Sequence, residues 1–247
     1  MKLLIDFGNS RCKWARCEEG ALQSVDAIEY ARQTTQQRVE GVMQAIHIDD
    51  IKQVHAVSVL GAEFEESFAN QLASLAGITV KFHHSQKNNY GVTLSYSNVH
   101  TYGDDRYAAL IAAHHQVGGN KIVVDCGTAT TIDMIDSQGH HEGGLIMPGA
   151  RLMVESLVNK ASGVFSNETK QPVNLLCNNT QDAVYSGCVS QLQYGVQGII
   201  NKLTDGKQCV VILTGGESSL LDLTTIADTE CIQRPHLVLE GLRVMQE

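Results

Sequence analysis

The sequence has few of the residues and patterns that mark several large classes of protein. Only 3 of its 247 residues are proline, 5% are aromatic, and 18 Lys and Arg stand against 27 Asp and Glu, leaving a net charge of −9. Nucleic acids and anionic membranes are bound through clustered Lys and Arg, which this chain lacks. We therefore expect neither as a partner, and any bound phosphate must be held by backbone N–H groups, an isolated lysine or a metal ion.

Long apolar runs and cysteine motifs are lacking as well. An acidic residue at position 6 leaves no room for the apolar stretch of a signal peptide. No apolar run approaches the ~20 residues that are needed to cross a bilayer. The seven cysteines form no Cys-x-x-Cys pair, which favours reduced thiols and a cytoplasmic location. The adjacent histidine pairs have no metal-ligand spacing, and no G-x-S-x-G hydrolase elbow is present.

Short apolar runs alternate with helical patterns along the chain. Residues 3–5, 122–124 and 210–213 are apolar and each run leads into a polar, glycine-containing turn, as buried strands do. Apolar residues recur at helical spacing over the stretches 105–116, 151–158 and 182–203. Strands alternating with helices predict an α/β protein.

A weak internal repeat divides the chain. LLIDFGNSRCKWARCEEG and IVVDCGTATTIDMIDSQG share a pattern of strand, Asp-x-Gly turn and second apolar stretch, about half a chain length apart. The repeat predicts two similar α/β domains, residues 1–117 and 118–247, each opening with a β-hairpin. The boundary falls at VGGN, where the glycines break the helical pattern.

The first Asp-x-Gly hairpin has the parts of a phosphate site. Gly8 permits a tight turn with exposed N–H groups, Asn9 and Ser10 add short side-chain donors, and Lys13 brings a positive charge on the returning strand. Asp6 at the strand end can hold a hydrated Mg²⁺. An ordinary hairpin without a ligand explains the same residues. The second hairpin favours the phosphate site, because two such turns can clamp a polyphosphate.

Three further motifs complete the candidate site. Asp125 is followed by a turn rich in threonine, and the pair Gly215-Gly216 after a buried strand lets a flat ligand such as adenosine approach the backbone. In Gly103-Asp104-Asp105-Arg106, a carboxylate can accept the proton of an alcohol and the arginine can hold an anionic part of it. Either aspartate can instead serve as the N-cap of the helix that follows.

The motif series resembles that of the type III pantothenate kinase family, within the superfamily of acetate and sugar kinases, heat-shock ATPases and actin. Seven segments carry the resemblance in order: DFGNSRCK, NNYGV, GDDR, DCGTATTID, GGLIMPG, NNTQDAVYSG and LTGGE. The resemblance covers nearly the whole chain. It implies an actin-like, ribonuclease H-like duplication and ATP-dependent phosphorylation of pantothenate, the first step of coenzyme A synthesis.

The resemblance also assigns residues. It implies that ATP contacts Asp6, Phe7, Gly8, Asn9, Ser10, Arg11, Cys12, Lys13 and Thr128. Pantothenate would be bound by Tyr90, Gly103, Asp104, Asp105 and Arg106, and by Thr180 of the neighbouring subunit of a homodimer. Asp105 would be the catalytic base, since Asp104 occupies the variable position of the motif. Asp125 would hold a monovalent cation, K⁺ or NH₄⁺.

Two alternatives remain open at this point. Another small-molecule kinase of the same superfamily would keep both hairpin turns and differ at the acceptor pocket. A non-catalytic regulatory protein on this fold would have lost Asp6, Lys13 or Asp105, and all three are present. The helix expected over 182–203 carries an apolar stripe that either forms the dimer interface or packs on its own sheet.

Overall fold

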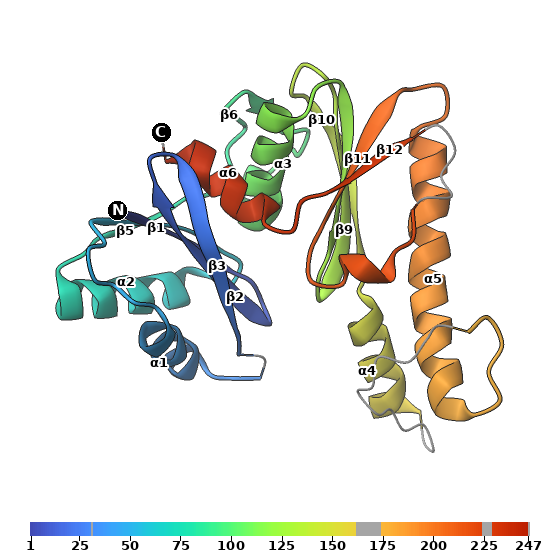
Figure 1. Cartoon of the computed structure of the whole chain (residues 1–247), viewed down its shortest axis with the longest axis horizontal. Helices are drawn as coiled ribbons and strands as arrows, with labels where there is room; N and C mark the ends of the chain where they lie inside the picture. Colours follow the sequence, from blue (N-terminus) through green and yellow to red (C-terminus); the bar gives the residue numbers. More distant parts are fainter. Residues whose placement is uncertain (31, 162–173, 224–228, 247) are drawn as a thin grey trace. The chain divides into compact units, whose positions relative to one another are not determined.

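The computed structural model describes residues 1–30, 32–161, 174–223 and 229–246 (Figure 1). Its contacts divide the chain into two compact units. The first unit comprises Met1–Gly118, Ser137–Gly143 and His236–Glu247, and the second comprises Gly119–Asp136 and Gly144–Pro235. The division into domains 1–117 and 118–247 stays a prediction, and the C-terminal segment departs from it because it groups with the first unit.

The first unit contains a mixed five-stranded sheet in the order β3-β2-β1-β4-β5. Its strands are β1 (Lys2–Phe7), β2 (Arg11–Glu18), β3 (Ala21–Glu29), β4 (Gln53–Ser58) and β5 (Val80–Phe82). β1 and β2 form the predicted antiparallel hairpin, and β4 runs parallel to β1. Successive side chains of a strand point to opposite faces, and β1 is buried on both faces, so the helix that a side chain contacts assigns its face.

Helices α1 (Thr35–Ala45) and α2 (Ala62–Ala76) cover one face of this sheet (Figure 1). Phe7 from β1 packs edge-on against Phe64 and Phe68 of α2, with ring centroids 4.9 and 4.8 Å away. This aromatic cluster anchors the core of the unit. Phe7 therefore lies on the face that α1 and α2 cover, and the side chain of its neighbour Asp6 lies on the opposite face.

The opposite face carries α3 (Asp104–Gln116) and α6 (Leu237–Met245), which lie side by side (Figure 1). The helices approach so closely that a Cβ at Gly241 would collide with the carbonyl oxygen of Ala108. This packing explains why the C-terminal segment groups with the first unit. Between β5 and α3 run β6 (Asn88–Asn89), β7 (Val92–Thr93) and the 3-10 turn η1 (Val99–Thr101).

The second unit repeats the strand order of the first, as β10-β9-β8-β11-β12. Its strands are β8 (Asn120–Cys126), β9 (Ala129–Ile135), β10 (His141–Pro148), β11 (Cys209–Thr214) and β12 (Glu230–Gln233). The pairing directions repeat as well: β8 and β9 form an antiparallel hairpin, and β11 runs parallel to β8. The α/β fold with two similar halves, predicted from the repeat, is therefore confirmed.

Helices α4 (Ala150–Lys160) and α5 (Thr180–Leu203) pack together in the second unit, and the 3-10 turn η2 (Ser218–Leu220) follows β11. The apolar stripe of α5 contributes Val189, Leu192 and Val196 to the core of its own unit. The stripe therefore packs on its own sheet, which removes it as an argument for a dimer interface. Among the described residues, no helix is long and apolar enough to cross a membrane.

Candidate active site

Asp6 and Lys13 are cross-strand neighbours at the end of the first hairpin. Side chains paired in this way have their Cβ atoms about 4.5–5.5 Å apart, so the two side chains leave the same face of the sheet as neighbours. Both lie on the face opposite Phe7 and Cys12, whose side chains are 0% exposed. Of the eight residues predicted to bind ATP here, Phe7 and Cys12 can therefore contribute only their backbone.

Hydrogen bonds hold the turn of this hairpin in one shape. The Gly8 N–H donates to the Arg11 carbonyl at 3.1 Å, and a Cβ at Gly8 would lie 3.0 Å from the same oxygen. The Tyr30 hydroxyl donates to the Gly8 carbonyl at 2.8 Å. Asn9 at the tip is exposed, while Arg11 is paired with Glu29 on β3. The turn thus presents short polar groups on a fixed backbone.

The thiol beside this turn is not a nucleophile. Burial raises the pKa of Cys12 well above its usual value, and the charge of Asp6 adds to the shift. A thiolate is the reactive form of cysteine, so Cys12 stays protonated and acts as a core residue.

The Gly-Asp-Asp-Arg motif begins α3, with Gly103 at the N-cap position. Neither aspartate is the N-cap that the sequence also allowed, because Gly103 holds that position and no side-chain hydrogen bond is made at this cap. Asp105 folds back so that a Cβ at Gly103 would lie 2.6 Å from its Oδ1. The motif therefore requires glycine at its first position to make room for the carboxylate of Asp105.

The two aspartates differ in their surroundings. Asp104 Oδ1 accepts a hydrogen bond from the Ser85 N–H at 2.7 Å, and Oδ2 lies 2.9 Å from Nδ1 of His84. Asp105 Oδ1 accepts a hydrogen bond within its own turn, from the Arg106 N–H at 2.7 Å. Burial raises the pKa of the Asp105 carboxyl, although Arg106 opposes the shift. A carboxylate made more basic in this way is suited to accept a proton.

Aromatic rings hold the side chain of Arg106. The residue is buried, and its guanidinium carbon lies 4.4 Å from the ring centroid of Tyr102 and 5.9 Å from that of Tyr96. Stacking of this kind fixes the plane of a guanidinium group. Arg106 is thereby a positive charge of defined position, next in sequence to Asp105.

Tyr90 occupies the turn of the β6–β7 hairpin. Tyr90 and Gly91 both have positive φ, 52° and 73°, as the two-residue turns that match strand twist require. The Tyr90 hydroxyl donates to the carbonyl of Met245 at 3.3 Å, and His115 bonds the Tyr90 carbonyl at 2.9 Å. The turn is therefore anchored on α3 and α6, and contact of Tyr90 with pantothenate stays a prediction.

In the second unit, three loops meet at the end of β8. The Gly149 N–H donates to the Thr128 carbonyl at 3.0 Å, and the Glu217 N–H donates to the Cys126 carbonyl at 2.9 Å. A Cβ at Gly215 would collide with the carboxylate of Asp125. The glycine after β11, predicted from its place in the sequence, thus lets the backbone pass directly beside Asp125.

Carboxylates accumulate around this junction. Burial raises the pKa of Cys126 to about 12, with further contributions from the charges of Asp125 and Glu217. The residue opposite Asp125 on β9 is Thr131, whereas the corresponding neighbour of Asp6 in the first unit is Lys13. The two hairpins thus share a backbone plan and differ in charge.

Thr180 is exposed at the first turn of α5 and is not the N-cap of that helix. Asn179 takes that role, and its side-chain oxygen accepts from the Asp182 N–H at 2.9 Å. Thr180 is therefore left with its side chain at the surface, in keeping with a contact outside its own helix.

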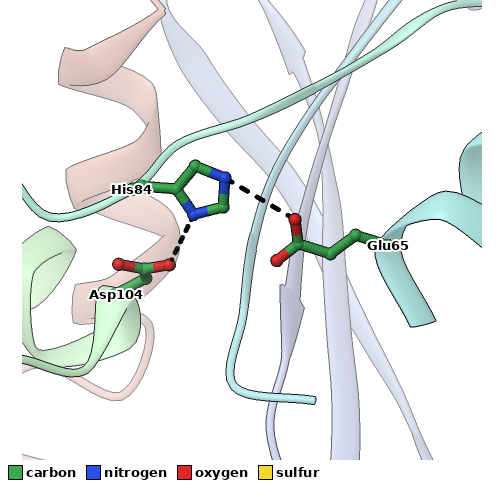
Figure 2. A group of neighbouring side chains, drawn as sticks. All are labelled: Glu65, His84 and Asp104. Atoms are coloured by element: carbon green, nitrogen blue, oxygen red, sulfur yellow. Dashed lines mark hydrogen bonds and ion pairs between the residues drawn. The ribbon is translucent and has the colours of Figure 1, made fainter. Parts of the chain in front are cut away.

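Sequence reasoning missed two histidine groups in the first unit. His55 and His83 are buried, with Nδ1 and Nε2 2.9 Å apart. His84 lies between the carboxylates of Glu65 and Asp104 (Figure 2). The only signal was the adjacent pair His83-His84, and its meaning depends on residues from α2, β4 and α3.

The fold defines the class of protein. The structure resembles a ROK family glucokinase from Streptomyces griseus, with a TM-score of 0.56 and 12% identity over 99% of this chain and 98% of that one. A Campylobacter jejuni structure described as a Baf family transcriptional activator matches with a TM-score of 0.57 and 21% identity, over 99% and 97%. Both likenesses concern the fold alone, which is that of the actin-like ATPases and sugar kinases.

Sequence similarity identifies the family within that class. A profile of type III pantothenate kinase matches residues 2–202. The type III pantothenate kinase of Azoarcus sp. (strain BH72) is 32% identical over 251 residues, covering 99% of this chain and 90% of that protein. The chain belongs to the type III pantothenate kinase family, which confirms the resemblance carried by the seven motifs.

Proposed function

We propose that this chain transfers the γ-phosphoryl group of ATP to the primary hydroxyl of pantothenate, which yields 4'-phosphopantothenate for coenzyme A synthesis. Membership of the type III pantothenate kinase family over nearly the whole chain carries the proposal. The placement of Asp105 at the start of α3 supports it, because the reaction needs one carboxylate to orient and deprotonate an alcohol.

Asp105 is the base of the proposed reaction. The hydroxyl oxygen of pantothenate forms a bond to the γ-phosphorus while the bond to the bridging oxygen of ADP breaks, and the hydroxyl proton passes to the Asp105 carboxylate. Burial raises the pKa of Asp105, which increases its affinity for that proton. Arg106, held over Tyr102, binds an anionic or polar part of the acceptor, and Gly103 and Asp104 shape the same turn.

The first hairpin binds the phosphates in this proposal. Lys13 and the N–H groups of the turn offset negative charge as it develops, an effect that depends on groups fixed before the reaction. Asp6, mostly buried at the strand end, would hold Mg²⁺ through water. Kinases use a divalent metal with ATP, and Mg²⁺ supplies charge neutralisation between the phosphate oxygens when bound.

The second unit offers a fitting place for a monovalent cation. Asp125 stands where carbonyl oxygens of Cys126, Gly127 and Thr128 approach other loops. Oxygen atoms of this type can coordinate K⁺ and can accept hydrogen bonds from NH₄⁺. The cross-strand neighbour of Asp125 is the neutral Thr131. A bound cation would offset repulsion between Asp125 and the polyphosphate, with Gly215 and Gly216 beside adenosine.

The working unit in this proposal is a homodimer in the cytoplasm, with Thr180 reaching the pantothenate of its neighbour. Large apolar side chains exposed in the second unit support an interface between subunits, because burial there would remove apolar surface from water. They are Leu145, Ile146, Leu152, Leu157, Leu175, Leu176 and Tyr194. All lie on or near β10, α4 and α5.

The test is ATP consumption by the purified protein with Mg²⁺ and K⁺, across pantothenate, pantetheine and a panel of sugars. We expect ADP to form with pantothenate, at a rate that Asp105→Asn lowers by ~10²-fold or more. Consumption with a sugar in place of pantothenate would instead support another kinase of the superfamily. An absence of consumption with every acceptor would support a regulatory protein.

A further inference from the structure

The first turn of α3, which carries Asp105, is fastened to the loop after β5. Asp104 Oδ1 accepts from the Ser85 N–H at 2.7 Å and lies 2.9 Å from the Ser85 hydroxyl, whose proton is shared with the Tyr102 carbonyl at 3.1 Å. Asp104 Oδ2 lies 2.9 Å from Nδ1 of His84. Both oxygens of Asp104 are thus engaged with residues 84 and 85 of this loop, so the side chain ties the first turn of α3 to it.

His84 extends this attachment to a third element. Its Nε2 lies 3.6 Å from Oε2 of Glu65, in the first turn of α2. Figure 2 shows the imidazole between the two carboxylates, with one ring nitrogen directed at each. A doubly protonated imidazole has two N–H donors, whereas the neutral ring has one donor and one acceptor. Only the cation is therefore matched to both carboxylates.

The charges around the ring favour its protonated form. Burial lowers the pKa of His84, but the bond to Asp104 and the charges of Glu65 and Asp104 outweigh burial and leave the pKa above its usual value. The third titratable neighbour, His83, has a pKa lowered to about 4 by burial and is neutral near pH 7. His84 is 58% exposed, so its proton exchanges with solvent.

The imidazolium also separates two like charges. Burial raises the pKa of Glu65, His84 opposes the shift, and the charge of Asp104 adds to it. Without the cation, Glu65 and Asp104 would repel each other across a short distance, and α2 and the first turn of α3 would lose their link. Protonated His84 supplies a positive charge between the two carboxylates.

We propose that protonated His84 is a positioning residue, which bridges Glu65 and Asp104 and so holds the first turn of α3, with Asp105, in its working place. The proposal rests on the proposed function for the reaction that it serves, while the bridge itself is independent of the substrate. Loss of the proton at alkaline pH leaves one carboxylate without its donor, and kcat falls as the turn loosens.

Two substitutions separate charge bridging from mere packing. His84→Gln keeps a polar side chain without the positive charge, and we expect kcat to fall by ~10-fold to ~100-fold, as misplacement of a reacting group produces, with the KM for ATP unchanged. His84→Lys keeps a cation with several donors, and we expect it to retain most of kcat and to lack the alkaline decline of the wild type. His47→Gln, at an exposed histidine of the same unit, is the matched control and should match the wild type.

Kinetics and amide hydrogen exchange are measured on the same proteins. Wild-type kcat and pH profile in His84→Gln would overturn the proposal, as would a lowered kcat with an unchanged pH profile and no rescue by His84→Lys. Faster exchange of the first-turn amides of α3 in His84→Gln supports the bridge whatever the substrate. If the wild type does not phosphorylate pantothenate, the proposed function fails, and unchanged exchange in His84→Gln would separately overturn the bridge.

Discussion

Asp104 and Asp105 are adjacent, carry the same side chain and have different surroundings. Asp104 is bonded to Ser85 and His84, whereas Asp105 is bonded within its own turn and its pKa is raised by burial. The sequence alone left the choice of base to the family motif, because Ser85 and His84 are distant in the chain. The surroundings of the two carboxylates favour the same choice.

Asp105→Asn tests this assignment at the scale of the residue. The amide keeps the size of the side chain but cannot accept the proton, so we expect kcat to fall by ~10²-fold to ~10⁴-fold while ATP binding survives. Steady-state kinetics and nucleotide titration measure the two quantities. Wild-type turnover in Asp105→Asn, together with an inactive Asp104→Asn, would show that the assignment is reversed.

The sequence predicted the strands and the turn of the first hairpin but not the direction of every side chain in it. The Asp-x-Gly pattern is local, so it predicted a strand, a turn and a second strand where β1 and β2 form. The side chains of Phe7 and Cys12 point into the core, which follows from strand alternation once the aromatic residues of α2 are known to cover that face. Their predicted contact with ATP is restricted to the backbone for this reason.

At the scale of the elements, the pairing of α3 with α6 was beyond the sequence. It joins segments more than a hundred residues apart, through a close approach at Gly241 that no local pattern marks. The repeat alone suggested that each half is continuous in the chain. The structure shows instead that the last helix returns to the first unit.

Gly241→Ala tests the importance of this helix pair. The added methyl group meets the carbonyl of Ala108, so we expect the helices to separate and the unfolding free energy to fall by ~1–3 kcal/mol. Thermal or urea unfolding measures the change. Gly195→Ala in α5 is the control, because its Cβ meets nothing within 4 Å, and it should raise stability by about 0.5–1 kcal/mol. Equal effects of the two substitutions would contradict the packing argument.

The His55–His83 pair links β4 to the end of β5 and makes stability depend on pH. Burial lowers the pKa of both side chains to about 4, against 6.5 for an unperturbed histidine. The unfolded chain therefore binds protons at these histidines more tightly than the folded chain does. The contribution of the pair to the unfolding free energy is complete above pH 6.5 and is lost as the pH falls toward 4.

Melting temperatures between pH 7 and pH 4 test this dependence. We expect a steep fall in the wild type and a shallower one in His55→Gln, because glutamine does not titrate. His47→Gln, at an exposed site, should keep the wild-type slope. A slope in His55→Gln as steep as that of the wild type would assign the acid sensitivity to other groups.

At the scale of the whole molecule, the duplication gives two hairpins of the same plan with different charges. Lys13 stands opposite Asp6, and the neutral Thr131 stands opposite Asp125. We therefore expect the second hairpin to require an added cation when ATP is bound, and activity to depend on K⁺ or NH₄⁺ as well as Mg²⁺. Rates measured in a Tris or Na⁺ buffer stripped of both ions check this expectation. Full activity there would contradict it.

A shared site in a homodimer makes a prediction that single variants cannot test. We expect Thr180→Arg and Asp105→Asn each to be inactive, and a mixture of the two to regain activity, because a mixed dimer has one site with neither defect. Activity is measured after subunit exchange, which sedimentation or mass spectrometry confirms. Freely exchanging but inactive mixtures, or an active monomer, would contradict the shared site.

The most direct test of the central claim is identification of the product. Purified protein is incubated with ATP, Mg²⁺, K⁺ and pantothenate, and the product is characterised by mass spectrometry and ³¹P NMR. The account predicts a phosphomonoester on the primary hydroxyl of pantothenate, formed in equal amount with ADP and ~10²-fold to ~10⁴-fold more slowly with Asp105→Asn. ATP turnover that leaves pantothenate unmodified, or unmodified ATP under these conditions, would contradict it.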